Sequence, residues 1–393
     1  MPPIARPQSL IVLLAALVAF GPLSIDMYLP SLPSIGRDLD AGEAQVQMTI
    51  SLFLGGLCLG MLFYGPLSDR FGRRRLLLGG IVLYLVASLG CALADDVGQL
   101  QFWRLLQALG GAAASVLARA IVRDLFPLGD AARVLSLMHL VTMLATLVAP
   151  LLGGYLMHLA AWRSQFLLLL GFAAICLLAV AWKIPETHPP SARGASLGQA
   201  FRAYGRMARE PLALGYTLCM GACFGGMFAF ISASPFIYIE HFGVSPMGYA
   251  WLFALNILGI IVVTLLNARL VVELAPQRIL AGATWVIATA GGVLALVGLS
   301  GWGGLPMLVV AVLGYISFTG MIGANCLACL LAAYPQQAGA AAGLAVAMQF
   351  GLGMLGSALV SALHDGTPLP MCLVLAGAGG LSLLACRVAL RRF

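Results

Sequence analysis

Long apolar segments recur from one end of this sequence to the other, and they constrain the fold more than any other feature. A helix needs about 20 apolar residues to cross the ~30 Å hydrocarbon core of a bilayer. Of the 393 residues, 61% are hydrophobic and 9% are charged, whereas a soluble domain carries about 25% charged residues. We therefore predict an all-α membrane protein with about twelve transmembrane helices. The predicted spans lie near residues 10–29, 46–66, 76–94, 100–121, 134–157, 163–182, 212–238, 249–271, 279–299, 306–332, 339–362 and 370–390.

Lysine and arginine residues gather in alternate connections between these spans, which hold 18 of the 21 basic residues. The other three are Arg37, Arg104 and Arg163. Positively charged loops stay on the cytoplasmic side of a membrane. We therefore predict that both termini and the central loop are cytoplasmic, and we interpret the net charge of +7 as a topology signal rather than as a nucleic-acid-binding surface.

The longest polar stretch, at about residues 183–211, divides the spans into two sets of six. It contains several prolines and four arginines, a composition that favours a cytoplasmic linker with a surface helix. We predict an N-terminal six-helix bundle over residues 1–182 and a C-terminal bundle over residues 212–393. Paired halves are typical of transporters, whose substrate site lies near the bilayer midplane between them.

Asp26 is the one acidic residue that the pattern places within the membrane. A charge there costs on the order of 3 kcal/mol or more, so an intramembrane acid is interpreted as functional. Low dielectric favours the neutral carboxyl group, which suits a proton carrier; the alternative is an interfacial acid in water. At about 1.5 Å per residue, Arg104 in the fourth span lies at a similar depth and is the predicted partner, unless it extends to the lipid headgroups. His139 in the fifth span is the next candidate proton carrier.

A charged segment flanked by glycines joins the second and third spans. Gly65 and Gly72 permit a tight turn and close helix approach, and Asp69 can pair with Arg73. Such a latch can hold one conformer of a two-state protein and release it in the other. The alternative is a basic loop that only sets topology.

Groups that could support catalysis are sparse. Cys326 and Cys329 form a C-x-x-C pair, but they lie in an apolar helix and are expected to pack rather than to bind metal. The sequence contains no Ser/His/Asp grouping, no H-E-x-x-H and no P-loop. We predict that the protein is not an enzyme and has no metal or other cofactor.

The segment at residues 65–75 resembles the G-x3-D-R-x-G-R-R-R motif of the major facilitator superfamily. In that family the motif forms a cytoplasmic gate, which an acid at the end of span four joins; Asp124 fits this acid. The resemblance therefore implies a twelve-helix transporter of this fold. The implied gate residues are Gly65, Asp69, Arg70, Gly72, Arg73 and Asp124.

Three other segments resemble motifs of the same superfamily. Residues 104–110 resemble the R-x-x-Q-G motif of span four, with Ala108 in place of its glycine. Residues 149–154 resemble the G-P-x-x-G-G motif of span-five antiporters, with Ala149 in place of its first glycine, and residues 184–187 resemble the P-E-T after span six. The implied residues of the span-five motif are Pro150, Gly153 and Gly154.

Residues 26–30, 118–125, 232–236 and 364–367 narrow the resemblance to the Bcr/CflA subfamily of bacterial drug-resistance exporters. This resemblance implies a multi-pass protein of the bacterial inner membrane that exchanges protons for bicyclomycin- or chloramphenicol-like compounds. Some related exporters carry a second acid early in span one, whereas residues 17–20 have none here. We therefore expect largely neutral substrates.

Together these features predict a proton-coupled antiporter that exports small, largely neutral amphipathic antibiotics by alternating access, powered by the proton gradient without a cofactor. Its expected partners are drugs, protons and the lipid bilayer, not nucleic acid, and it is expected to be a monomer. A proton-coupled importer of a small metabolite with the same fold is the alternative. A receptor or scaffold without transport is a third class, against which the intramembrane Asp26 and Arg104 argue.

A pocket for such drugs is expected to be apolar and aromatic, with a few polar groups that orient the ligand. Aromatic residues at helical spacing also pack helices together, so pattern alone does not separate the two roles. The candidate substrate-binding residues are Tyr28, Gln107, Phe230, Ser232, Phe236, Tyr315, Asn325 and Gln349.

Overall fold

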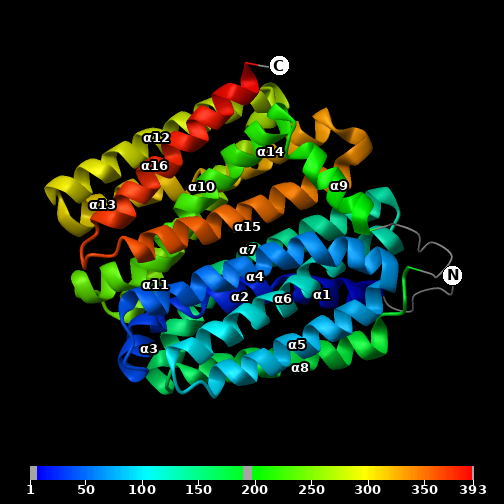
Figure 1. The fold of residues 1–393 in the computed structure, drawn as a ribbon, viewed down its shortest axis with the longest axis horizontal. Helices are drawn as coiled ribbons and strands as arrows, with labels where there is room; N and C mark the ends of the chain where they lie inside the picture. The colour runs from blue at the N-terminus through cyan, green and yellow to red at the C-terminus, as the bar shows by residue number, and fades with distance from the viewer. Residues whose placement is uncertain (1–6, 189–196, 392–393) are drawn as a thin grey trace.

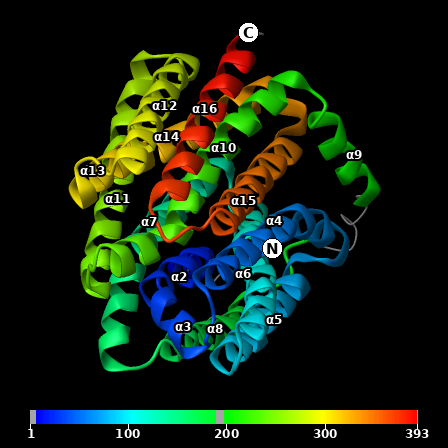
Figure 2. The same ribbon diagram turned by 60° about the vertical axis from the view of Figure 1, so that its left-hand side comes forward.

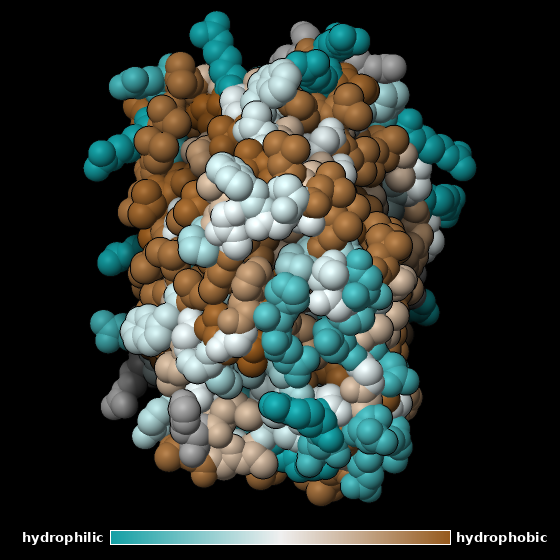
Figure 3. Space-filling view, turned by 90° about the vertical axis from the view of Figure 1, so that its left-hand side faces the viewer, coloured by the Kyte–Doolittle hydropathy of each residue, from teal (hydrophilic) through white to brown (hydrophobic). Residues whose placement is uncertain are grey.

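The computed structural model describes residues 7–188 and 197–391. Twelve helical segments in these ranges are long and apolar enough to cross a membrane, which confirms the predicted number of spans. The helices run side by side along the long axis of the molecule (Figure 1). Hydrophobic side chains cover much of the surface in the space-filling view, with hydrophilic side chains gathered in one part of it and along the rim (Figure 3). Arg6, Arg193 and Arg392, three basic residues in the topology prediction, lie outside the described residues.

The N-terminal half contains six spans. The first is built from several short helices, and each of the other five is one continuous helix. The elements are α1 (Pro7–Val18), α2 (Phe20–Asp26), the 3-10 turn η1 (Leu29–Ser31), α3 (Leu32–Asp38), α4 (Glu43–Phe71), α5 (Arg73–Ala92), α6 (Val97–Leu125), α7 (Leu128–Leu159) and α8 (Arg163–Lys183).

The C-terminal half also contains six spans, preceded by a short helix in the linker region. Three of these spans are composite, because α10 continues into a π-helical turn, α14 follows α13 after two residues, and a 3-10 turn precedes α15. The elements are α9 (Leu197–Met207), α10 (Pro211–Pro235), η3 (Phe236–His241), α11 (Pro246–Glu273), α12 (Pro276–Ser300), α13 (Gly304–Ile316), α14 (Thr319–Ala333), η4 (Pro335–Gln337), α15 (Ala338–Ala362) and α16 (Leu369–Leu390).

The first span is longer than predicted, and the difference moves Asp26 away from its end. The predicted span stops at about residue 29, but the helical segment runs from Gln8 to Asp38. Pro30 and Pro33 sit in the first turns of η1 and α3, where a missing N–H costs no hydrogen bond, so the prolines restart the helix rather than end it. Asp26 thus lies twelve residues before the end of its span, and Arg104 lies seven residues after Val97, where α6 begins. The predicted end of the first span, close to Asp26, was therefore wrong, although Arg104 lies beside the backbone of α2 at Ser24.

Helices α4 and α15 pack along each other and join the two halves (Figure 2). The Ser51 and Ser357 hydroxyls lie 2.8 Å apart, and the Ser361 hydroxyl donates to the carbonyl of Ala44 at 2.7 Å. Gly55 of α4 also lies close to Met354 of α15, because a Cβ on Gly55 would be 2.8 Å from the Met354 sulfur. The two hydrogen bonds are at the end of α4 that lies away from the predicted latch.

Candidate functional site

Asp26 lies where three helices from both halves of the molecule meet. It is the last residue of α2 and is 5% exposed. Its carboxyl group is close to the Thr146 hydroxyl of α7, which donates to the carbonyl of Thr142 at 3.0 Å. It is also close enough to Tyr249 of α11 for an electrostatic interaction. A change in the packing of α7 or α11 would therefore change the surroundings of this carboxyl group directly.

The two glycines of the span-five motif build this junction. A Cβ on Gly153 would lie 2.0 Å from the carbonyl oxygen of Met27, so α7 approaches the backbone beside Asp26 as closely as only glycine allows. A Cβ on Gly154 would lie 3.4 Å from the side chain of Ala250 in α11. Adjacent glycines thus face the first span and the opposite bundle, while Pro150 lies inside α7 one turn earlier.

Arg104 is fully buried and is surrounded by aromatic rings from three other elements. Its guanidinium carbon lies 4.1 Å from the ring centre of Phe53, 4.5 Å from that of Tyr28 and 5.9 Å from that of Phe166. A cation over the faces of aromatic rings is stabilised by their quadrupoles, and more so away from water. These rings keep a buried charge in the membrane interior without a carboxylate beside it.

Arg104 does not pair with Asp26 in this conformation. Its Nη1 donates to the carbonyl of Ser24 at 3.0 Å and to Gln107 Oε1 at 2.7 Å. Its Nε and Nη2 have no hydrogen-bond partner. Gln107 in turn donates to the Ser88 hydroxyl at 2.9 Å. The structure thus brings Arg104 to the backbone two residues before Asp26, but it does not bring the two charged groups together.

The latch residues of the N-terminal bundle do come together. Arg73 Nη1 lies 2.6 Å from Asp69 Oδ1, and Arg73 Nε lies 3.1 Å from Asp124 Oδ2. Arg73 also donates to the Ser68 hydroxyl. One arginine side chain therefore ties α4, α5 and α6 together, as the sequence predicts for Asp69, Arg73 and Asp124. Arg70 instead lies over the neighbouring Phe71 ring, 5.4 Å from its centre.

The segment after α8 completes the latch. The backbone N–H of Arg73 donates to Glu186 at 2.8 Å, and the Thr187 hydroxyl donates to Asp124 at 3.0 Å. Gly72 joins α4 to α5 with φ of +96°, a conformation that favours glycine. Gly65 is different, because a Cβ there would meet no atom within 4 Å. The predicted close helix approach at Gly65 is therefore absent from this conformation.

The eight candidate substrate-binding residues are divided between the two bundles rather than gathered around one described cavity. Tyr28 and Gln107 belong to the surroundings of Arg104. Phe236 lines a cavity of about 10 Å³ between the bundles, together with Gln47 and His364. A space of this size holds about one water molecule and not a drug.

The other five candidates lie inside the C-terminal bundle. The ring of Phe230 stacks on that of Phe253 with centres 6.2 Å apart. Asn325 donates to Asn267 Oδ1 at 2.7 Å, a bond that joins α14 to α11. Ser232 and Tyr315 bond to backbone carbonyls of α10, and Gln349 is half-buried. Their part in substrate binding stays a prediction.

The site also contains residues that no sequence pattern singles out: Thr146, Tyr249, Phe53 and Phe166. Each is one hydroxyl or aromatic residue among many in a long apolar helix, and only the packing brings it to Asp26 or Arg104. His139 lies near Arg119 of α6. Within residues 7–188 and 197–391, the structure contains no cluster of three His, Cys, Asp or Glu side chains that could hold a metal ion.

A family profile described as "Major Facilitator Superfamily" matches residues 12–386. A "Bicyclomycin resistance protein homolog" of Haemophilus influenzae is 33% identical over 376 residues, which cover 95% of this chain and 94% of that protein. An uncharacterized MFS-type transporter of Bacillus subtilis, YdgK, is 36% identical over 365 residues, 91% of this chain and 90% of that one. A "Chloramphenicol resistance protein" of Pseudomonas aeruginosa is 34% identical over 246 residues, 62% of this chain and 58% of that one.

Solved structures share the fold at low sequence identity. A D-xylose-proton symporter superposes with a TM-score of 0.73 at 17% identity, covering 96% of both chains. The nucleoside transporter NupG superposes with a TM-score of 0.74 at 13% identity, covering 98% of this chain and 100% of that one. These likenesses confirm the predicted architecture of two six-helix bundles. The relatives are named as transporters and resistance proteins, in agreement with the prediction that the chain is not an enzyme.

Proposed function

The chain belongs to the major facilitator superfamily of membrane transporters, and from this premise we propose that it is a proton-coupled drug antiporter. It exports small, largely neutral amphipathic antibiotics across the bacterial inner membrane, acts as a monomer and has both termini in the cytoplasm. The names of two relatives, a bicyclomycin resistance protein homolog and a chloramphenicol resistance protein, support this substrate class.

One observation carries the proposal: Asp26 lies at the junction of both bundles. Its neighbours Thr146 and Tyr249 come from α7 and α11, which belong to opposite halves. Alternating access requires the halves to move against each other, so the same motion changes the polarity around the carboxyl group. A site that binds a proton in one state and releases it in the other couples the proton gradient to the motion.

Arg104 gives this carboxyl group a second environment. Two of its guanidinium nitrogens have no hydrogen-bond partner, and its third is anchored to the carbonyl of Ser24 in the same short helix as Asp26. Ser24 and Asp26 lie on nearly opposite sides of a helical turn, so a rotation of the first span about its axis is needed to bring Asp26 to these free donors. A cation beside a carboxyl group favours its charged form. Arg104 and Asp26 would therefore pair in the state in which Asp26 releases its proton, and they would separate in the state in which Asp26 binds one.

The latch and the contacts between bundles lie at opposite ends of α4. Asp69 is close to its C-terminal end, whereas Ser51 and Ala44, which bond to α15, are near its beginning. With the latch on the cytoplasmic side, this arrangement corresponds to a conformation closed toward the periplasm. Drug would enter from the cytoplasm, and Asp26 would exchange its proton at the junction between the two bundles.

An aromatic cluster in the C-terminal bundle suits an uncharged ligand beside Asp26. Tyr249 contacts the rings of Tyr238 and Phe253 at centre distances of 6.0 and 6.1 Å, and both of these contact Phe230 at 6.2 Å. The Tyr238 hydroxyl has no hydrogen-bond partner. All four rings are buried in this conformation, so a drug would reach them only when the helices around them separate, and apolar rings with one free hydroxyl suit small amphipathic drugs.

The test is accumulation of labelled chloramphenicol in a drug-efflux-deficient bacterial host with and without this protein. We expect lower accumulation with the protein, and an uncoupler that dissipates the proton gradient should restore it. Higher accumulation in the presence of the protein would indicate import and would contradict the proposal. Equal accumulation of chloramphenicol and bicyclomycin with and without the protein would remove the proposed substrate class.

A further inference from the structure

Helix α9 carries a row of arginines that proton-coupled export does not use. Arg202, Arg206 and Arg209 follow one another at intervals of four and three residues, so they share one side of the helix and of the turn after it. All three are exposed, whereas Met207 on the other side is 2% exposed. The helix is therefore strongly amphipathic, with a basic face directed away from the protein.

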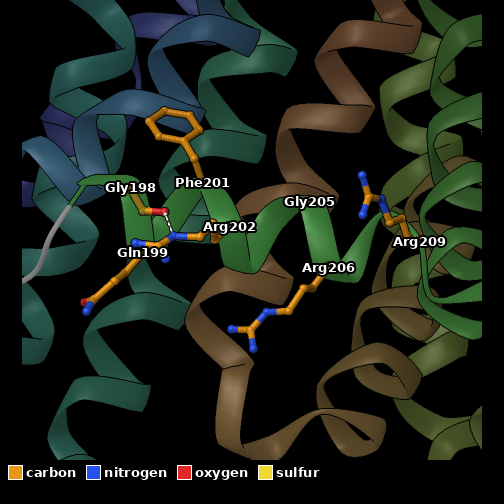
Figure 4. A pocket seen from close by; sticks show the side chains of 7 residues that line it. All are labelled: Gly198, Gln199, Phe201, Arg202, Gly205, Arg206 and Arg209. Atoms are coloured by element: carbon orange, nitrogen blue, oxygen red, sulfur yellow. Dashed lines mark hydrogen bonds between the residues drawn. The ribbon is translucent and has the colours of Figure 1, made fainter.

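The basic face borders an open space of about 590 Å³ at the surface, which we call the arginine hollow, and all of its lining residues come from α9 and the turn after it. A Cβ on Gly205 would meet no atom within 4 Å, so this glycine leaves space in the floor. Figure 4 shows the arginine side chains spread around this stretch of helix. The lining residues are Gly198, Gln199, Phe201, Arg202, Gly205, Arg206 and Arg209.

The charges in the hollow lack a counter-ion from the protein. In the described parts of the chain, none of the three arginines forms an ion pair with a carboxylate. Arg202 Nε donates to the carbonyl of Gly198 at 3.0 Å, which leaves its terminal nitrogens available. The nearby Glu210 accepts from the Tyr334 hydroxyl at 3.0 Å. Free arginine donors on one side of a helix can bind the oxygens of a phosphate.

The packing of α9 places this hollow beside the membrane. The Phe201 ring contacts that of Phe63 in α4, with centres 5.1 Å apart, and Phe63 is itself 41% exposed. Tyr204 lies against Gly343 of α15, and burial, together with the nearby Asp69, raises the pKa of its hydroxyl. Since α4 and α15 are membrane spans, α9 lies across the latch ends of one span from each bundle, at the level where lipid headgroups begin.

We propose that the arginine hollow of α9 binds the headgroup of an acidic phospholipid from the leaflet on the latch side. The phosphate would accept from Arg202, Arg206 and Arg209, and Gly205 would admit the glycerol portion. Acidic phospholipids are attracted to clustered arginines at the end of membrane spans. Because α9 contacts both α4 and α15, the bound lipid would also join the two bundles at the end opposite the Ser51–Ser357 contact.

The experiment is native mass spectrometry of the purified full-length protein with phosphatidylglycerol or phosphatidylcholine of the same acyl chains. The measured quantity is the ratio of lipid adducts that each species retains. We expect wild type to retain phosphatidylglycerol preferentially. A variant with Arg202→Gln, Arg206→Gln and Arg209→Gln should lose this preference by roughly fivefold for each arginine removed.

Two further variants make the test specific. Gly205→Leu fills the hollow without changing charge and should also lower phosphatidylglycerol retention. The matched control removes three exposed arginines elsewhere, Arg133, Arg278 and Arg391, by substitution with Gln, and it should keep the wild-type preference. The proposal is overturned if wild type retains both lipids equally or if either α9 variant keeps the wild-type preference. It is also overturned if the control loses as much of the preference for phosphatidylglycerol as the triple arginine variant of α9.

Discussion

The two bundles share an architecture but differ in what they bury. Among the described residues, the buried charged side chains are Asp26, Arg73 and Arg104, and all three belong to the N-terminal bundle. The C-terminal bundle buries hydroxyl, amide and thiol groups and a cluster of aromatic rings instead. A buried charge is costly in a membrane and persists where it has a function. The difference suggests that the N-terminal bundle carries proton coupling and gating, and that the C-terminal bundle mainly provides shape.

The same contrast holds at equivalent places in the two halves. In the N-terminal bundle, Arg73 ties Asp69 and Asp124 together with two ion pairs. In the C-terminal bundle, Asn267 lies near the end of α11, as Ser68 and Asp69 lie near the end of α4, and it accepts from Asn325 at 2.7 Å. An amide pair is insensitive to pH and to nearby charge. Only the N-terminal network can therefore respond to a change in electrostatic environment.

The largest effect is expected from Asp26→Asn. The amide imitates the protonated carboxyl group and cannot release a proton, so export driven by a pH gradient should fall to background while the protein still inserts. Uptake of labelled drug into inverted vesicles measures this. Asp38→Asn, which alters an exposed acid in the same span, is the control and should transport like wild type. If the Asp26→Asn protein still exports drug in response to a pH gradient, proton coupling does not depend on the buried acid of the N-terminal bundle.

The next largest effect is expected from Gly153→Ala. The added Cβ would lie 2.0 Å from the carbonyl oxygen of Met27, so α7 must move away from the backbone beside Asp26. Overpacking of this kind costs about 1–3 kcal/mol, and we expect export to fall on the order of tenfold. The control is Gly171→Ala in α8, where a Cβ meets nothing within 4 Å. Comparable losses in both variants would indicate a general effect of helical glycines.

A smaller effect is expected from Asp69→Asn. Arg73 would keep its ion pair with Asp124 and lose the one with Asp69, whose side chain is 39% exposed and therefore partly screened by water. We expect a severalfold fall in transport with normal amounts of protein in the membrane. If Asp69→Asn protein transports like wild type, the segment at residues 65–75 is only a topology signal.

The smallest effect is expected in the C-terminal bundle. Asn325→Leu removes the bond to Asn267 and leaves its oxygen buried without that donor, which costs about 1–3 kcal/mol of stability. Thermal unfolding in detergent should show this loss of stability as a lower unfolding temperature than that of wild type. The dependence of transport on pH should keep its wild-type shape, because no titrating group has been touched. A shifted pH profile would show that the Asn267–Asn325 pair takes part in proton coupling.

Most of the fold could be predicted from the sequence because membrane spans depend on composition and length, which are local properties. The Asp69–Arg73 pair could be predicted because Gly72 permits a tight turn between the two residues, which belong to α4 and α5. The length of the first span could not be predicted from the sequence, because Pro30 and Pro33 restart the helix instead of ending it.

The surroundings of the two deep charges could not be predicted either. Arg104 is surrounded by Tyr28, Phe53 and Phe166, and Asp26 meets Thr146 and Tyr249, all through contacts between distant parts of the chain. Aromatic and hydroxyl residues occur throughout the spans, so their identity gives no sign of which ones face a charge. The substrate pocket shares this difficulty, because a residue that packs helices and one that binds a drug follow the same helical spacing.

If Asp26 carries the exchanged proton, binding of a drug should release that proton into solution. Purified protein in weakly buffered detergent solution at mildly alkaline pH is mixed with chloramphenicol while a pH-sensitive dye is monitored. We expect wild type and Asp38→Asn to release protons when drug is added, and Asp26→Asn to release none. Release from Asp26→Asn equal to that of wild type would show that another group carries the proton, with His139 the next candidate.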